Sequence, residues 1–162
     1  MDSVRFASLL LSAVWIGGLA ALGGVAAPVV FAVLQAHDPV AGRTVAGELF
    51  GAILLRYQHL LWVTGALQLA LLGARAALGP PPRRFKLQLL VLLAMLAATS
   101  YSALVIAPKI DNIRASTPTT IAALPDDSAV KREFGRLHGL SSGLMALALA
   151  GALGLFWFDS RE

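Results

Sequence analysis

Four long stretches without Asp, Glu, Lys or Arg constrain this chain more than any other feature. They cover Phe6–Ala36, Tyr57–Ala74, Leu87–Pro108 and Leu137–Phe158, and each is rich in Leu, Ala and Val. A helix that crosses a bilayer needs about 20 mainly apolar residues, and each stretch is close to or above that length. None shows the alternation of apolar and polar residues that a transmembrane β-strand requires. Because lipid offers the backbone no hydrogen-bond partners, helices are the expected solution.

The sequence therefore predicts an all-α fold, an integral membrane bundle of four transmembrane helices. We expect these helices over residues 5–36, 45–78, 85–113 and 131–158, in a single membrane domain that covers 1–162. Pro28 and Pro108 lie near the ends of the first and third helices, which they are expected to kink or stop. Only 14% of the residues are charged, against about 25% in a soluble domain, so the expected surrounding is a lipid bilayer. The chain has no cysteine, which excludes disulfides and thiolate chemistry.

Basic residues flank the apolar stretches at both membrane faces. The formal net charge is +4, and Lys and Arg at helix ends extend toward lipid headgroups. No aromatic-rich basic module accompanies them, so we expect no nucleic-acid partner. The Pro-rich segment after Leu78 carries Arg83, Arg84 and Lys86, and short basic loops favour the cytoplasm. We therefore expect a multi-pass protein of the bacterial inner membrane, with both termini cytoplasmic.

Small residues recur at helical spacing in the first and fourth stretches. Helices in lipid associate by close packing of such residues. The two stripes comprise Ala13, Gly17 and Ala21 with Ala20 and Gly24 beside them, and Gly139, Gly143, Ala146, Ala150 and Gly154. We expect them to be packing seams, either within the chain or between the copies of a homo-oligomer.

Ionisable residues gather where the second, third and fourth helices meet one membrane face. Such groups are costly at membrane depth and usually face the bundle interior or a wet cavity. This polar cluster consists of Glu48, Arg56, Lys109, Asp111 and Arg114. It is expected either to line an entrance for a charged solute or to form salt bridges that tie the helix ends together.

His59 and His138 lie toward the same end and are candidate ligands for a cofactor. Neutral imidazole binds divalent metals and haem iron, and Met145 follows His138 on the same predicted helix face. The alternative is that both histidines hydrogen-bond the loop backbone or each other. Binding of haem or a divalent metal is thus one of two interpretations, because no HExxH or paired-carboxylate motif marks a metal site.

Several short motifs resemble the transmembrane protein 205-like family. They are Trp15-Ile16-Gly17-Gly18, Ala27-Pro28-Val29-Val30-Phe31, Gly47-Glu48-Leu49-Phe50, Ala107-Pro108-Lys109-Ile110 with Arg114, and Phe134 with Leu137-His138-Gly139-Leu140-Ser141. The resemblance covers nearly the whole chain, and the family is more distantly similar to copper-resistance-D-type and haem-binding four-helix membrane proteins. It implies a four-helix membrane fold without an agreed activity, and its distant relatives add weight to metal or haem binding.

Three functional classes remain open. The first is a non-enzymatic bundle whose polar end binds a small ligand, a metal or a partner. The second is a transporter or channel-like oligomer for a small solute, and the third is a haem-binding membrane redox protein that uses His59 and His138. We favour the first class and expect no catalytic residues, because the sequence shows neither a phosphate loop nor a recognisable catalytic motif.

Overall fold

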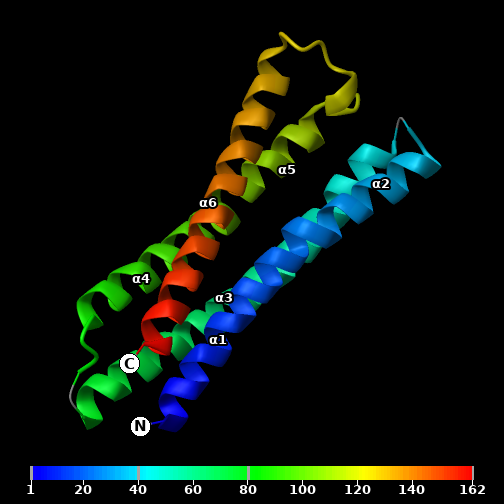
Figure 1. The fold of residues 1–162 in the computed structure, drawn as a ribbon. Helices are drawn as coiled ribbons and strands as arrows, with labels where there is room; N and C mark the ends of the chain where they lie inside the picture. The colour runs from blue at the N-terminus through cyan, green and yellow to red at the C-terminus, as the bar shows by residue number, and fades with distance from the viewer. Residues whose placement is uncertain (1, 40, 80, 162) are drawn as a thin grey trace.

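The chain folds almost entirely into helices (Figure 1). The structure is a computed structural model that describes residues 2–39, 41–79 and 81–161. It is 89% helical, and this part of the chain contains no strand. Four helical segments are long and apolar enough to cross a membrane: Ser3–His37, Gly42–Leu78, Phe85–Ser116 and Ala129–Ser160. The predicted all-α membrane fold with four spans is confirmed.

Two of the four segments are interrupted and two are continuous. The first comprises α1 (Asp2–Ala21), the π-helical turn η1 (Leu22–Ala26) and α2 (Ala27–His37). The third comprises α4 (Phe85–Tyr101), the π-helical turn η2 (Ser102–Ile106) and α5 (Ala107–Ser116). The second and fourth are α3 (Gly42–Leu78) and α6 (Ala129–Ser160), with a short 3-10 helix η3 (Ile121–Ala123) before α6. The observed segments overlap the predicted helices and extend beyond them by up to three residues.

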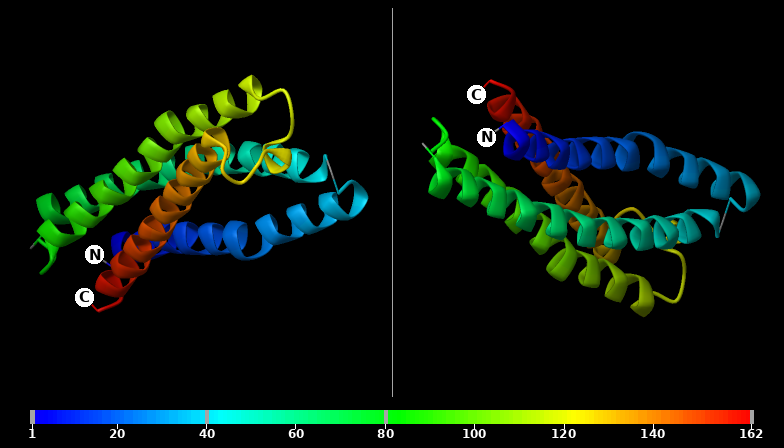
Figure 2. Two further views of the ribbon diagram at one scale, coloured as in Figure 1. Left: turned by 90° about the horizontal axis from the view of Figure 1, so that it is seen from above. Right: turned by 90° about the horizontal axis from the view of Figure 1, so that it is seen from below.

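An Ala-Pro pair follows each π-helical turn. The Ala27 N–H donates to the Leu22 carbonyl and the Ala107 N–H donates to the Ser102 carbonyl, five residues back. Pro28 and Pro108, which have no N–H to donate, come next, where the wider turn has already displaced the regular hydrogen-bond ladder. Neither proline stops its segment, because α2 continues to His37 and α5 to Ser116. The first segment instead bends past η1 (Figure 2).

The bundle is tight at its centre and open at one end. Both termini lie at one end, and the α2–α3 and α5–α6 connections lie at the other (Figure 1). In the centre, α1, α3, α4 and α6 pack around a core that includes Trp15, Leu61, Leu92 and Met95. Beyond the π-helical turns, the main contacts are those of α2 with α3 and of α5 with α6. At this end the bundle therefore consists of two helix pairs, α2 with α3 and α5 with α6, which diverge from each other (Figure 1).

Large apolar side chains cover the outside of the bundle. Phe6, Leu60, Leu104 and Leu147 are each exposed, and they come from all four spanning segments. In water this surface would be strongly unfavourable, whereas lipid tails solvate it without cost. The chain is therefore an integral, multi-pass membrane protein.

The glycines of the predicted small-residue stripes do not mark close helix contacts within the described part of the chain. A Cβ atom would meet nothing within 4 Å at Gly17, Gly24, Gly139, Gly143 or Gly154. Close contacts are instead made by Gly18 beside Tyr57, Gly65 beside Leu96 and Gly151 beside Met95. The internal seams thus use different small residues, and the homo-oligomer that the stripes suggested stays a prediction.

Candidate ligand-binding cavity

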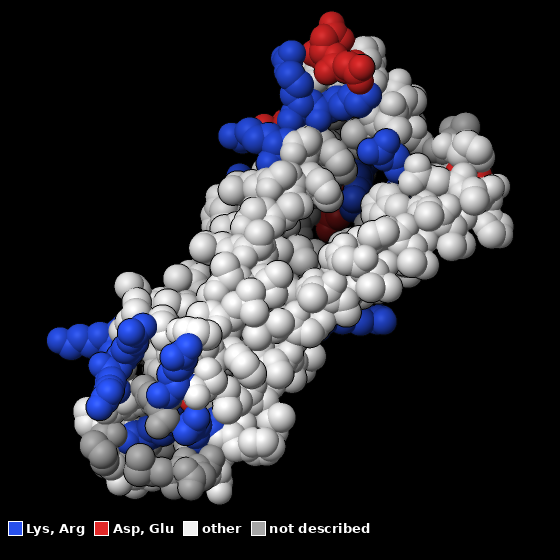
Figure 3. Space-filling model, viewed as in Figure 1, with Lys and Arg blue, Asp and Glu red and all other residues white. Residues whose placement is uncertain are grey.

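A cavity of about 330 Å³ lies between the two diverging helix pairs. One wall comes from α2 and α3, and the other from α5, η3 and α6. The space-filling view shows the hollow between these pairs, with Lys and Arg along its walls and some acidic surface within it (Figure 3). Phe31 and Arg114 belong to α2 and α5, so both lie beyond the π-helical turns. Each of the two interrupted segments therefore contributes a residue to one wall of the cavity.

Basic side chains dominate the cavity wall. Arg43, Arg114 and Lys131 line it together with His138, and no Asp or Glu is among its lining residues in the part of the chain that the structure describes. Arg43 forms no ion pair with any described residue. Cations thus outnumber carboxylates among the described lining residues, although acidic surface lies deeper in the hollow (Figure 3), and this excess of positive charge attracts anions.

Lys131 connects the cavity to the loop above it. Its Nζ donates to the Leu124 carbonyl at 2.9 Å and to Asp126 Oδ1 at 2.7 Å. The hydrogen bond and the positive charge of Lys131 both lower the pKa of Asp126 below its ordinary value. Asp126 is almost fully exposed, so the high dielectric constant of water weakens its attraction for Lys131. Lys131 therefore still contributes positive charge to the cavity.

Arg114 bridges three helices. Its guanidinium lies against α3, where a Cβ at Gly47 would come within 2.8 Å of Nη2 and a Cβ at Gly51 within 3.9 Å of Nη1. The same group lies 5.5 Å from the centre of the Phe134 ring on α6, a cation–π distance. Its one ion pair among the described residues is with Asp111 at 3.5 Å, and Asp111 is largely exposed. Gly47 and Gly51, one helical turn apart, thus provide the space in which an arginine from α5 reaches α3.

Apolar groups complete the cavity. Phe31, Ile121 and Ala122 line it beside Phe134, whose ring stacks parallel to that of His138 with 6.3 Å between their centres. The cavity thus combines cations that can bind an anion with aromatic and aliphatic faces that can contact an apolar group. Ligand sites commonly have this composition and a volume of about 300–1,000 Å³.

The structure places the two candidate histidines in different surroundings. His138 lines the cavity. His59 does not line it; its Nδ1 lies 2.8 Å from the Leu55 carbonyl on its own helix, and its ring contacts Trp62 edge to face. Trp62 is half-buried, and its indole nitrogen is buried. No group of three or more His, Asp or Glu residues that could hold a metal occurs in 2–39, 41–79 and 81–161. Joint ligation of haem or a metal by His59 and His138 stays a prediction.

The predicted polar cluster is divided. Only Arg114 of its five members lines the cavity. Among the described atoms, the one ion pair within the set joins Asp111 to Arg114 in the same helix, so it does not connect different helix ends. Glu48, Arg56 and Lys109 are exposed.

Two sets of polar residues emerge only from the structure. The first set is Arg43 and Lys131, which the sequence indicated only as basic residues that flank the apolar stretches. Both lie in the opening turns of α3 and α6, at the same membrane face as Arg114, and this shared position could have identified them as site residues. The second lies near the termini, where Arg75 Nη1 donates to Asp159 Oδ1 at 2.7 Å. Buried glutamines also interrupt the apolar stretches, at Gln58, Gln68 and Gln88.

The fold and the cavity define a class: a multi-pass membrane bundle with a cationic cavity at one end. The chain matches the family described as a domain of unknown function (DUF4149) over residues 10–119, and it belongs to that family. The matched region runs from α1 to the loop after α5, so it includes Phe31, Arg43, Gly47 and Arg114 of the cavity. No curated protein and no solved structure matches the chain.

Proposed function

We propose that this protein is a non-enzymatic membrane protein that binds a small anionic ligand in the cavity between its diverging helix pairs. The observation that carries the proposal is the wall of Arg43, Arg114 and Lys131 around about 330 Å³, without a lining carboxylate among the described residues. Charge-assisted hydrogen bonds to an anion are about twice as strong as neutral ones, and a guanidinium can bind two oxygens at once. A bound anion would thus offset the positive charges of Arg43, Arg114 and Lys131, which line the same cavity.

Binding is favoured over catalysis by the kinds of group in the wall. The cavity offers cations, aromatic rings and the Thr44 hydroxyl, with His138 as its one lining imidazole. A wall of cations and aromatic rings with a single imidazole supports ligand binding more directly than an enzymatic role.

Thermal unfolding of the chain in mild detergent tests this proposal. Glycerol 3-phosphate should raise the unfolding midpoint more than sodium chloride of equal ionic strength, because a ligand at 100 times its Kd stabilises by about 2.7 kcal/mol. Arg114→Gln should abolish this rise. Arg132→Gln removes an equal charge from an exposed position beside the cavity and should preserve it. Equal responses to phosphate and chloride would rule out a specific anion site.

A transporter for a small solute is the second candidate, supported by buried polar groups below the cavity. Ser102 and Ser141 are hydrogen-bonded at 3.0 Å between η2 and α6. Gln58, Thr99 and Ser102 line a space of about 10 Å³, close to the volume of one water position. Below it, the apolar core around Trp15 separates these groups from the Ser12–Gln68 hydrogen bond. Flux of glycerol 3-phosphate into proteoliposomes that Gln58→Leu blocks would favour transport.

The likeness to the transmembrane protein 205-like family is also a proposal. It is supported by the roles of its motif residues, since Ala27-Pro28 and Ala107-Pro108 follow the two π-helical turns. Gly47 and Arg114 belong to two further motifs, and the Arg114 guanidinium lies against Gly47 in the cavity wall. A metal function of the copper-resistance-D type would need a metal to bind the purified chain, which elemental analysis would detect.

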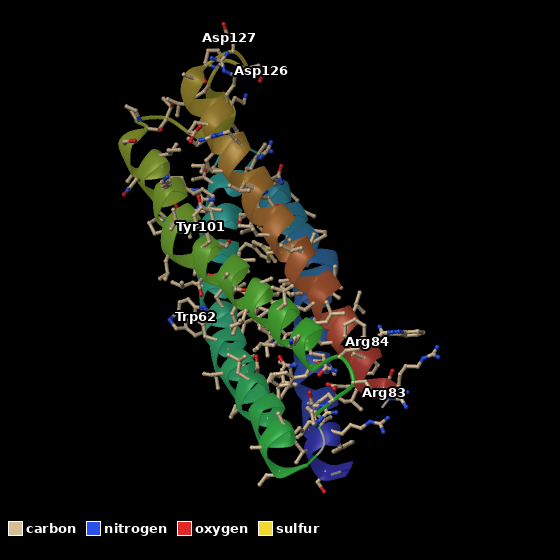
Figure 4. The ribbon with its side chains drawn as sticks, turned by 90° about the vertical axis from the view of Figure 1, so that its left-hand side faces the viewer. Trp62, Arg83, Arg84, Tyr101, Asp126 and Asp127 are labelled. Carbon is tan, nitrogen blue, oxygen red and sulfur yellow. The ribbon has the colours of Figure 1, made fainter. Side chains whose placement is uncertain are left out.

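We also propose the bacterial inner membrane as its location, with cytoplasmic termini. Arg83 and Arg84 support this orientation because they lie near the termini, at the opposite end from Asp126 and Asp127 (Figure 4). Short basic loops are retained in the cytoplasm. The cavity then faces the other side of the membrane.

A further inference from the structure

The cavity lies at the depth of lipid headgroups. The spanning segments contain 32 to 37 residues, whereas about 20 suffice to cross the hydrocarbon core, so their ends extend into the headgroup region. Arg43 is the second residue of α3, Lys131 the third of α6, and Arg114 lies two residues before the end of α5. All three cations therefore belong to the interfacial ends of the helices.

The cavity also opens sideways. Figure 3 views the bundle across its long axis and shows the hollow between the helix pairs from this side. A hollow that is visible from the side of a transmembrane bundle faces the plane of the membrane. On α2, Ala27 and Pro28 lie one helical turn from Phe31, toward the centre of the bundle, and they are half-buried and exposed respectively. A lipid can therefore place its headgroup between the cations while its chains stay against an apolar helix surface.

We propose that the cavity binds the phosphate of an anionic phospholipid, an inference that rests on the proposed anion-binding function. A phosphodiester carries one permanent negative charge and two free oxygens, which matches the fork of Arg114 with Arg43 and Lys131 around it. The diacylglycerol part of the lipid would contact the aromatic and aliphatic wall of Phe31, Ile121 and Phe134. A water-soluble phosphate ester shares the phosphate chemistry, but it would use neither the lateral opening nor the apolar wall.

Binding to the full chain in mild detergent, followed by native mass spectrometry, tests this inference with three probes. They are phosphatidylglycerol, a diacylglycerol with the same chains, and glycerol 3-phosphate. We expect phosphatidylglycerol to bind at least about tenfold more tightly than either of the others, because only it offers both the charge and the chains. Arg43→Gln and Arg114→Gln should each weaken its binding roughly tenfold, and Arg132→Gln should leave it unchanged. Arg43 is exposed and unpaired among the described residues, so its variant should fold even if Arg114→Gln does not.

The remaining outcomes separate this inference from the proposed function. Equal binding of phosphatidylglycerol and diacylglycerol, or equal loss in the Arg132→Gln control, would overturn the lipid inference. Glycerol 3-phosphate that binds as tightly as the lipid, with the same dependence on Arg43, would also overturn it but would preserve the anion site. If no phosphate compound binds, both the inference and the proposed function fail.

Discussion

Asp159 connects three helices at the end where the termini lie. Its carboxylate accepts hydrogen bonds from Arg75 Nη1 on α3 at 2.7 Å and from Ser8 Oγ on α1 at 2.6 Å. Its backbone carbonyl accepts from Arg5 Nε at 2.7 Å. The Arg75 and Asp159 side chains are only 12% and 5% exposed, so the ion pair is largely shielded from water. At this position a carboxylate determines how the ends of α1, α3 and α6 meet.

Asp159→Asn should destabilise the fold. Removing one partner of a buried ion pair costs about 3–5 kcal/mol, because the other charge stays desolvated. We expect about 3 kcal/mol here, since Asn can still accept the Ser8 hydrogen bond. Equilibrium unfolding in mixed detergent measures the loss, with the exposed Asp127→Asn as a control of equal charge. Equal stability of the two variants would contradict a structural role for this ion pair.

Asp126 should compete weakly with an anionic ligand for Lys131. The pKa of Asp126 is lowered by its hydrogen bond to Lys131, so the contact is fully present above the ordinary pKa of the carboxyl. It is lost as the pH falls through the lowered pKa. Asp126→Asn should mimic this loss at pH 7 and strengthen phosphatidylglycerol binding about two- to threefold. Weaker binding in this variant would mean that Asp126 orients Lys131 instead of competing for it.

At the scale of elements, the Gly47–Gly51 turn of α3 positions Arg114. A Cβ at residue 47 would overlap the far end of the Arg114 side chain, whereas a Cβ at residue 51 would make an ordinary contact. Gly47→Ala should therefore displace the guanidinium while changing the free energy of unfolding by no more than about 1 kcal/mol. We expect its phosphatidylglycerol binding to fall several-fold and that of Gly51→Ala to stay unchanged. If both variants bind normally, the contact with α3 does not set the position of Arg114.

The elements themselves were predictable, but their rotation about their axes was not. Apolar length alone identified four spans, because lipid requires about 20 uncharged residues per crossing. In lipid the outward face is as apolar as the core, so hydropathy does not reveal which face turns inward. That is why Gly17 and Gly139 appeared to be seams, although a Cβ at either position would meet no described residue within 4 Å, while Gly18 contacts Tyr57. The same ambiguity means that the sequence does not say which way His59 faces; in the structure its ring contacts Trp62, and it is not among the residues that line the cavity.

The cavity residues were predictable only in part, for a related reason. Arg114 was identified because an ionisable group near membrane depth is unusual. Arg43 and Lys131 resembled ordinary basic residues at helix ends. They line one cavity because the α2–α3 and α5–α6 pairs separate beyond the π-helical turns, and the sequence does not show this separation. No spacing rule in the sequence locates a π-helical turn, although Ala-Pro follows both of them.

At the scale of the whole molecule, the two ends of the bundle differ in construction. The end with the termini is joined by Arg75, Asp159 and Ser8, with Arg5 bound to the backbone of α6. The opposite end is divided into two helix pairs, and Arg114 is the group that reaches from one pair to the other. One end joined by an ion pair and hydrogen bonds, and one divided end, suit a protein in which a ligand enters between the diverging helix pairs.

The orientation of this asymmetric bundle decides which leaflet supplies the lipid. The absence of cysteine allows single reporters at neutral positions, Thr119→Cys in the loop near the cavity and Ser160→Cys near the C-terminus. If the termini are cytoplasmic, a membrane-impermeant maleimide should label Thr119→Cys in intact spheroplasts and Ser160→Cys only after lysis. The cavity would then draw its lipid from the outer leaflet, where a headgroup can enter between α2 and α5 from the side. The reverse labelling pattern would contradict the proposed orientation and assign the cavity to the cytoplasmic leaflet, where anionic lipids give the surface its negative potential.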